Sequence, residues 1–178
     1  MKKFILFLML YFIVACYFND SPEVDNTPEK EVTQNLVIDR DYKGIILDNL
    51  KRTEKSVKVV MFVIKYSDDI DSPVREILTE ILSLKSKGVD IKFIMDKTTA
   101  VDYPQTTNFL IKNEIFFKLY SNVTLHTKMV ILDDKVVIFG SHNWTDSALN
   151  LNREVSFLTT DEKIVEKSKN YFEKIYSE

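Results

Sequence analysis

Residues 126–154 read HTKMVILDDKVVIFGSHNWTDSALNLNRE, and the first half of this stretch decides the expected fold. Two apolar runs, residues 125–132 and 136–139, are separated by Asp133-Asp134-Lys135. Apolar, β-branched runs joined by a short polar segment predict the two antiparallel strands of a hairpin. Such a hairpin brings the polar residues at its open end close together.

The chain on both sides of this hairpin predicts strands that alternate with helices. Apolar runs predict strands over residues 57–66, 89–95, 115–120 and 154–158. Apolar residues at helical spacing predict helices over residues 41–55, 73–88, 104–112 and 161–176, with a short helix after Asn143. Ser72-Pro73 and Asp161 are typical of helix starts, and Gly88 is typical of a helix end. We therefore expect an α/β fold, a mixed β-sheet flanked by helices.

The open end of the hairpin gathers polar side chains of several kinds. Alternate residues of a strand share a face, so His126 and Lys128 are predicted to project together. If Asp133-Asp134 forms a two-residue turn, Ser141 lies opposite His126, and a shift of one residue brings Asn143 there instead. Either register brings a histidine, a lysine, a hydroxyl and an amide to one place.

These side-chain types suit the cleavage of a phosphate diester. The imidazole of His126 can attack phosphorus and form a covalent intermediate that water then resolves. A carboxylate, from Glu154 or Asp133, can hold that imidazole in the required tautomer. The charge that develops on the phosphate oxygens needs hydrogen-bond donors. The available donors are Lys128, Ser141 and Asn143.

The spacing of these residues resembles a known signature. His126-x-Lys128-x4-Asp133, followed by Gly140-Ser141-x-Asn143 and Glu154, is similar to the active-site motif of the phospholipase D superfamily. The similarity is to compact single-motif members, which include bacterial endonucleases and a mitochondrial lipid- or RNA-cleaving branch. It extends in outline over residues 36–178.

The resemblance implies a phospholipase D-like fold and a reaction without metal or cofactor. In the family the histidine forms a phosphohistidine, the lysine and asparagine bind phosphate, the serine assists them, and the glutamate orients the histidine. These roles would fall to His126, Lys128, Asn143, Ser141 and Glu154. A second copy of the motif supplies the histidine that protonates the leaving oxygen. This chain has one copy, so the resemblance implies a homodimer whose two half-sites share one catalytic centre.

Most of these residues also have a simpler interpretation. His126 could be a hydrogen-bonded sheet residue, and Lys128 a solvated charge. Asp133 is predicted to be catalytic, but it is also typical of a turn, which leaves local hydrogen bonding as the alternative. His142 is interpreted as a non-catalytic neighbour, and Trp144 as a packing residue. A zinc site from His126, His142 and Asp133 is disfavoured because the ammonium of Lys128 would repel the metal.

The N-terminal segment predicts a cellular location. Residues 1–15 (MKKFILFLMLYFIVA) have two lysines and then an apolar run that is short for a membrane span. With Cys16 directly after them, they resemble a bacterial lipoprotein signal peptide with a lipidated cysteine. An uncleaved apolar anchor or a buried cysteine is the alternative. Residues 16–35 are polar, acidic and interrupted by Pro22 and Pro28, which predicts a flexible tether. We expect a catalytic domain over residues 36–178, held at the extracytoplasmic face of a bacterial membrane.

Composition narrows the choice of substrate. The only glycines are Gly44, Gly88 and Gly140. Because they are not clustered, the glycine-rich loops that bind nucleotides are excluded. From Leu36 onward the chain has 21 basic and 22 acidic residues, without the basic surplus usual in a nucleic-acid binder. Together with the predicted lipid anchor, this near-neutral charge favours membrane phospholipid as the substrate. An endonuclease acting on DNA or RNA and a non-catalytic surface lipoprotein with a relic fold are the alternatives.

Overall fold

One mixed sheet organises the protein. The computed structural model describes residues 32–178, in which seven strands lie in the order β1-β7-β6-β5-β2-β3-β4. The strands are β1 (Gln34–Ile38), β2 (Ser56–Met61), β3 (Asp90–Asp96), β4 (Phe116–Tyr120), β5 (Lys128–Leu132), β6 (Val136–Gly140) and β7 (Val155–Thr159). The helices are α2 (Asp41–Lys51), α3 (Pro73–Ser86), α4 (Lys97–Asp102), α5 (Pro104–Lys112), α6 (Asp146–Asn150) and α7 (Glu162–Ser177). The predicted signal segment, Cys16 and most of the predicted tether lie outside the described residues.

The strand directions divide the sheet into two parts. β2, β3 and β4 are parallel, and each connection between them carries one or two helices, as parallel neighbours require. β2 pairs antiparallel with β5, and the remaining strands β5, β6, β7 and β1 are all antiparallel to their neighbours. This confirms the expected mixed sheet.

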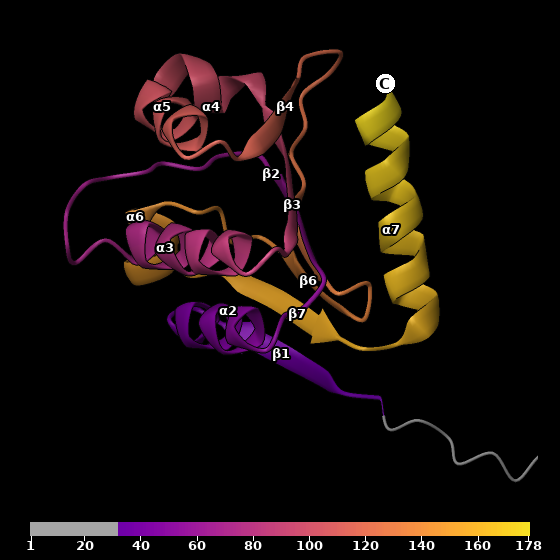
Figure 1. Cartoon of the computed structure of the whole chain (residues 1–178). Helices are drawn as coiled ribbons and strands as arrows, with labels where there is room; N and C mark the ends of the chain where they lie inside the picture. The colour runs from indigo at the N-terminus through magenta and orange to yellow at the C-terminus, as the bar shows by residue number, and fades with distance from the viewer. Residues whose placement is uncertain (1–31) are drawn as a thin grey trace, which may run out of the picture. The chain divides into compact units, whose positions relative to one another are not determined.

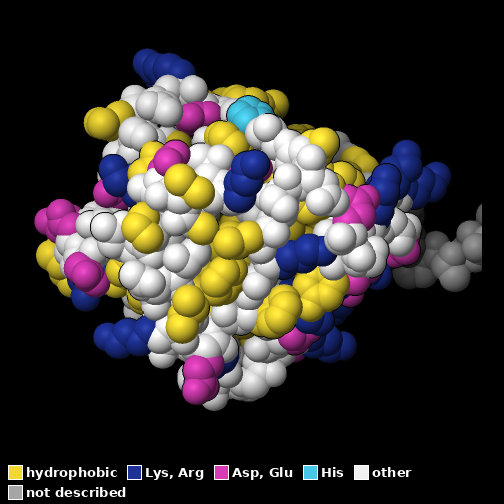
Figure 2. Space-filling view, turned by 90° about the horizontal axis from the view of Figure 1, so that it is seen from above, with side chains coloured by type: hydrophobic (Ala, Val, Ile, Leu, Met, Phe, Trp, Pro, Cys, Tyr) yellow, Lys and Arg dark blue, Asp and Glu magenta, His cyan; other side chains and the backbone are white. Residues whose placement is uncertain are grey.

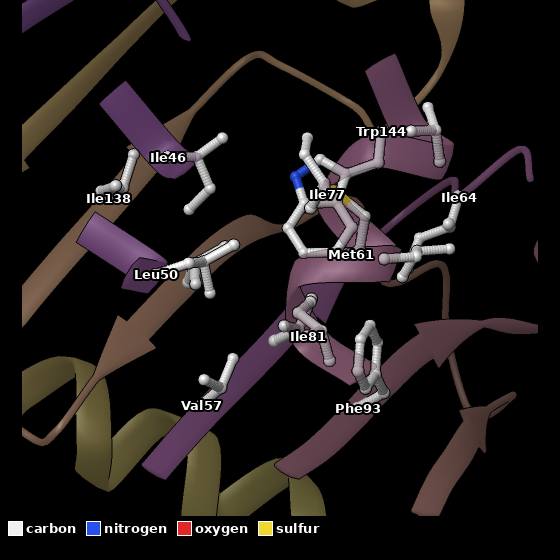
Figure 3. Close-up of a cluster of buried hydrophobic side chains, with 14 of the residues drawn as sticks. Ile46, Leu50, Val57, Met61, Ile64, Ile77, Ile81, Phe93, Ile138 and Trp144 are labelled. Atoms are coloured by element: carbon white, nitrogen blue, oxygen red, sulfur yellow. The ribbon is translucent and has the colours of Figure 1, made fainter. Parts of the chain in front are cut away.

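The helices cover the two faces of the sheet unequally. In Figure 1, α2, α3 and α6 lie on one side of the sheet, while α7 lies on the other. The larger apolar core fills the first side, where Ile46, Ile77 and Trp144 are fully buried (Figure 3). A smaller core lies under α7, around Phe172 and Ile131. Burial of these side chains from water is the main force that holds the layers together.

The expected helix ends are formed by the residues that predicted them. Ser72 accepts a hydrogen bond from the backbone of Arg75 at the start of α3, and Pro73 occupies its first turn. Gly88, with a φ of 88°, directly follows the end of that helix. Asp161 caps α7 by accepting from the backbone of Ile164 at 2.9 Å.

Two predicted strands are shorter than expected because their backbone amides bond side chains. β2 ends at Met61 and not at residue 66, since the amides of Val63 and Ile64 donate to the side chains of Asn143 and Thr99. β5 begins at Lys128 and not at residue 125. The end of β2 therefore lies beside the start of β5, where Met61 pairs with Lys128. Irregular segments extend from both strands at this point.

The hairpin also has a register that differs from both expected ones. Leu132 pairs with Val136, which leaves residues 133–135 in the turn. Continued to the open end, this register places His142 opposite His126, and neither Ser141 nor Asn143. At the other edge of the sheet, β1 begins at Gln34, so residues 34 and 35 belong to the sheet and not to the tether.

Candidate active site

His126 lies in the irregular segment directly before β5, and its side chain is exposed. The predicted same-strand pairing of His126 with Lys128 is therefore wrong. A hydrogen bond joins the two residues instead, in which the Nζ atom of Lys128 donates to the carbonyl oxygen of His126 at 2.8 Å. The residue before His126 is also fixed, because the backbone amide of Leu125 donates to the carboxylate of Asp96 at 2.8 Å.

Lys128 is the first residue of β5, and only 7% of it is exposed. Its Nζ atom lies 4.8 Å from the ring centroid of Phe62, and no carboxylate within residues 32–178 forms an ion pair with it. Burial lowers the pKa of Lys128, and the negative charge of Glu154 acts in the opposite direction. The ammonium group is thus largely removed from water and has no carboxylate partner among these residues, which suits it to bind an anion.

Ser141 and Glu154 meet where β6 ends and β7 begins. The hydroxyl of Ser141 donates to the Oε2 atom of Glu154 in a short hydrogen bond and accepts from the backbone of Val155 at 3.0 Å. The Oε1 atom of Glu154 accepts from the side chain of Asn152 at 3.0 Å. Gly140 is required here because a Cβ atom at this position would lie 2.4 Å from the Cα atom of Ser156.

Asn143 is half-buried and presents one side of its amide to the protein. Its Oδ1 atom accepts from the backbone of Val63 at 3.3 Å. Its Nδ2 group makes no hydrogen bond within the described residues and is available as a donor. The structure therefore brings Lys128, Asn143, Ser141 and Glu154 to the end of the sheet at which His126 lies.

The predicted contact between Glu154 and His126 is not formed within one chain. Among residues 32–178, no hydrogen bond reaches the imidazole of His126, whose ring contact is with Phe62 at 4.6 Å between centroids. Both carboxylate oxygens of Glu154 are engaged by Ser141 and Asn152. Within the described part of one chain, the imidazole of His126 is thus left without a carboxylate partner.

His142 has the structural role expected of a non-catalytic neighbour. It is fully buried, stacks on Tyr42 at 4.4 Å, and bonds the hydroxyl of Ser156 and the carbonyl of Asp39 through its two ring nitrogens. Burial lowers its pKa. Trp144 is also fully buried and donates to the hydroxyl of Tyr42 at 3.1 Å, as expected of a packing residue.

The predicted catalytic role of Asp133 is corrected by its position. Asp133 lies at the far end of β5, a whole strand away from Lys128. Its carboxylate accepts hydrogen bonds from the backbone amides of Glu54, Lys55 and Ser56, at distances of 2.7 to 3.2 Å. Asp133 therefore fixes the hairpin turn to the start of β2.

Two residues that border the site were missed by the sequence patterns. Phe62 contacts both His126 and Lys128 but lies within an apolar run that predicts a buried strand. Asp39, with a φ of 51°, accepts from the backbone of Glu154 at 2.8 Å and pairs with Arg153. Hydrogen bonds from Glu154 and Arg153 lower the pKa of Asp39. Asp39 lies far from Glu154 along the chain, so no sequence pattern predicts this contact.

The described residues contain no cluster of three or more histidine, cysteine or acidic side chains that could hold a metal ion. The disfavoured zinc set is not brought together, because both ring nitrogens of His142 are engaged and Asp133 is a strand away from His126. The arrangement instead offers a free imidazole, a desolvated cation and an amide donor. These groups can attack an anionic phosphate diester and stabilise its transition state.

Comparisons with known proteins agree with this chemistry. The family described as "Cardiolipin synthase, PLD-like domain" matches residues 46–176. A protein named mitochondrial cardiolipin hydrolase from Chlamydomonas reinhardtii is 25% identical over 136 residues, covering 73% of this chain and 55% of that protein. The human protein of the same name is 39% identical over 54 residues, covering 30% of this chain and 21% of that protein. The chain thus spans at most about half the length of these curated relatives.

Two solved structures have the same fold over nearly their whole length. NucT from Helicobacter pylori is 26% identical, with a TM-score of 0.69, and covers 83% of this chain and 97% of its own. Nuc from Salmonella typhimurium, titled a phospholipase D family member, is 18% identical, with a TM-score of 0.72, and covers 83% of this chain and 95% of its own. These matches confirm the predicted fold and agree with the predicted class of enzyme, a phosphodiester hydrolase.

Proposed function

The chain belongs to the family of phospholipase D-like domains, and on that premise we propose that it hydrolyses phosphate diesters through a phosphohistidine on His126. The proposed substrate is membrane phospholipid. One observation carries the chemistry: the imidazole of His126 and the buried ammonium of Lys128 contact the same Phe62 ring, and neither is paired with a carboxylate of residues 32–178. No metal takes part in the proposed reaction.

The proposed reaction has two steps. A ring nitrogen of His126 forms a bond to phosphorus while the bond to the leaving alcohol oxygen breaks, and the partner's His126 donates a proton to that oxygen. Water then attacks the phosphohistidine and releases a phosphate monoester, and the same histidine of the partner accepts a proton from the water. Lys128 and the Nδ2 group of Asn143 stabilise the charge on the phosphate oxygens.

Two observations favour phospholipid as the substrate. The relatives by sequence are named for cardiolipin, a phospholipid whose headgroup is a double phosphodiester. On the face of the described residues that Figure 2 shows, hydrophobic side chains gather at the centre, and the Lys and Arg side chains are separate and form no continuous stripe. A continuous basic stripe is the usual footprint of a nucleic-acid binder.

The substrate test offers two diesters to one preparation. The full chain, purified in detergent, is assayed on cardiolipin-containing vesicles and on single-stranded nucleic acid, each with and without EDTA. We expect release of a phosphate monoester from the vesicles, and its loss in His126→Asn. Equal activity of His126→Asn would contradict the phosphohistidine, loss of activity on adding EDTA would indicate a metal reaction, and inactivity on both substrates would favour the relic fold.

An endonuclease is the second candidate function. The observation in its favour is that the chain matches NucT and Nuc over nearly their whole length, and it resembles the compact branch that includes endonucleases. Cleavage of nucleic acid with cardiolipin left intact would establish this candidate and overturn the phospholipid proposal.

We propose that the working form is a homodimer, because one chain supplies one catalytic histidine and leaves it without an orienting carboxylate. An apolar patch borders the half-site on the face of the sheet that α7 covers only in part (Figure 1). The exposed fractions of four of its residues lie between 37% and 56%, and Phe157 is half-buried. The patch consists of Leu36, Ile38, Phe139, Val155 and Phe157, which are neighbours in the strand register.

The patch can be tested by the oligomeric state. Ile38→Asp places a charge within the proposed interface, whereas Ile111→Asp places it at an exposed position of α5, outside the patch, and serves as control. We expect Ile38→Asp alone to sediment as a monomer without activity. A dimeric Ile38→Asp variant, or a fully active monomer, would contradict the interface.

We further propose that Cys16 carries a lipid that holds the enzyme at an extracytoplasmic membrane face. No helix within residues 32–178 is long and apolar enough to cross a membrane. Expression of Cys16→Ala should move the protein out of the membrane fraction without loss of its activity on detergent-dispersed substrate. Retention of this variant in membranes would favour the apolar anchor.

A further inference from the structure

Phe62 contacts both His126 and Lys128 through one aromatic ring. The Nζ atom of Lys128 lies 4.8 Å from the ring centroid, and the imidazole centroid of His126 lies 4.6 Å from it at an interplanar angle of 52°. The distance from Nζ is within the range in which a cation is attracted to an aromatic face, and the two ring centroids are within the range of an aromatic contact.

The backbone that carries this ring is fixed from two sides. The carbonyl oxygen of Phe62 accepts from the hydroxyl of Thr99 in α4 at 3.1 Å. The next amide, that of Val63, donates to Asn143 at 3.3 Å. Since Asn143 is itself a proposed phosphate-binding residue, the second of these contacts links the backbone that carries the ring to the phosphate-binding part of the site.

The ring offers Lys128 a form of stabilisation that a carboxylate could not. An ion pair would hold the ammonium but cancel the charge that an incoming phosphate needs. A π-face attracts the ammonium and leaves its full charge. The same ring contacts His126, whose imidazole becomes cationic when it is bonded to phosphorus.

We propose that Phe62 is a positioning residue that holds the ammonium of Lys128 charged and in place and orients the imidazole of His126 for attack. This role rests on the proposed phosphodiesterase function, and it adds a residue that the motif does not contain. The groups that face Lys128 are His126, Glu154 and this ring, and of these only Phe62 contacts both Lys128 and the ring of His126.

The decisive measurement is the pKa of Lys128. It is measured in the full chain with labelled lysine, from the pH dependence of the carbon NMR signal of the Cε atom. Lys128→Arg identifies the signal. Phe62→Leu keeps an apolar side chain without a π-face, and Phe62→Tyr keeps the π-face. We expect the pKa of Lys128 to fall by roughly half a unit to one unit in Phe62→Leu, and to stay close to the unsubstituted value in Phe62→Tyr.

A purely structural role predicts a different result. Lost packing would lower the melting temperature of Phe62→Leu and leave the pKa of Lys128 unchanged, which would overturn the proposal. If Phe62→Leu does not fold, Phe62→Met provides the same comparison with a more flexible apolar side chain.

Activity assays then separate this proposal from the proposed function. We expect kcat/KM to fall about tenfold in Phe62→Leu and to recover in Phe62→Tyr, since one charge-positioning contact is lost and regained. An inactive unsubstituted protein would contradict the proposed function, while the NMR titration would still decide the role of the ring. Full activity of Phe62→Leu with an unchanged Lys128 pKa would overturn the positioning role.

Discussion

The carboxylate of Asp133 accepts hydrogen bonds from three consecutive backbone amides at the start of β2. Burial acts to raise the pKa of Asp133, but these hydrogen bonds outweigh it and the pKa is lowered. A lowered pKa in the folded state means that the ionised form stabilises the fold. This contribution is complete above the unfolded pKa of about 3.9 and is lost as the pH falls through the folded value.

Asp133→Asn should therefore destabilise the protein by roughly 1.5 to 3 kcal/mol at pH 7, because charge-assisted hydrogen bonds are lost. Urea unfolding measures this change, and the gap to the unsubstituted protein should narrow below about pH 4. Asp90→Asn, at an aspartate whose side chain is 56% exposed, is the control and should change stability by less than about 0.5 kcal/mol. A loss of turnover greater than about a hundredfold in folded Asp133→Asn would instead restore its catalytic role.

Two glycines provide a second comparison at the scale of single residues. A Cβ atom at Gly140 would lie 2.4 Å from the backbone of Ser156, whereas at Gly44 it would meet nothing within 4 Å. Gly140→Ala should lower stability by about 1 to 3 kcal/mol and also lower activity, because β6 and β7 must separate where Ser141 meets Glu154. Gly44→Ala lies inside α2 and should raise stability by about 0.5 to 1 kcal/mol. Thermal unfolding of both variants checks the opposite signs, and equal effects would contradict the packing of Gly140.

At the scale of elements, the start of α3 couples two helices. The hydroxyl of Ser72 accepts from the backbone of Arg75 and donates to Asp146 in α6 at 2.7 Å, and Ser72 is buried. Ser72→Ala should lower the free energy of unfolding by about 1 to 2 kcal/mol, since the cap is lost and Asp146 loses its partner. Ser86→Ala removes an exposed hydroxyl near the end of the same helix, and we expect a change within about 0.5 kcal/mol. Equal loss in both variants would show that the cap has no special role.

The elements with strong local signals could be predicted from the sequence, and those held by distant contacts could not. Ser72-Pro73 and Asp161 start helices where expected because a cap depends on residues within one turn. β1 was missed because its Gln34 and Asn35 are polar, and it is a strand only because β7 pairs with it. α4 was missed because residues 97–102 have no apolar period, and the carboxylate of Asp96 fixes its start.

The candidate site also combines features that the sequence predicts with contacts between distant residues that it does not. The types and order of His126, Lys128, Ser141 and Asn143 are carried by the motif, and these residues do lie at one end of the sheet. The motif gave Asp133 a catalytic role, but the predicted hairpin places it in the turn, and the structure bears out the alternative of local hydrogen bonding. The contacts of Phe62 depend on where β2 ends, and that end is set by amides that bond Thr99 and Asn143.

At the scale of the whole molecule, one chain supplies only part of the groups that the proposed reaction needs. The imidazole of His126 can attack, but the acid that protonates the leaving oxygen must be another group. His142 is buried and fully bonded, so within residues 32–178 no second histidine is available. A two-fold axis beside the half-site would supply the missing imidazole and cover the apolar patch at the same time.

Subunit mixing tests this shared centre without relying on any interface variant. In a dimer that needs both histidines, equal amounts of unsubstituted protein and His126→Asn, mixed and allowed to exchange, should form active dimers in about a quarter of cases. The expected rate is then about a quarter of that of the same total amount of unsubstituted protein, because each mixed dimer lacks either the nucleophile or the acid. Independent half-sites would keep about half of the rate, since every unsubstituted chain would remain active. Ile111→Asp mixed in the same ratio controls for the mixing procedure, and it should leave the rate unchanged because Ile111 is exposed on α5 and belongs neither to the half-site nor to the apolar patch.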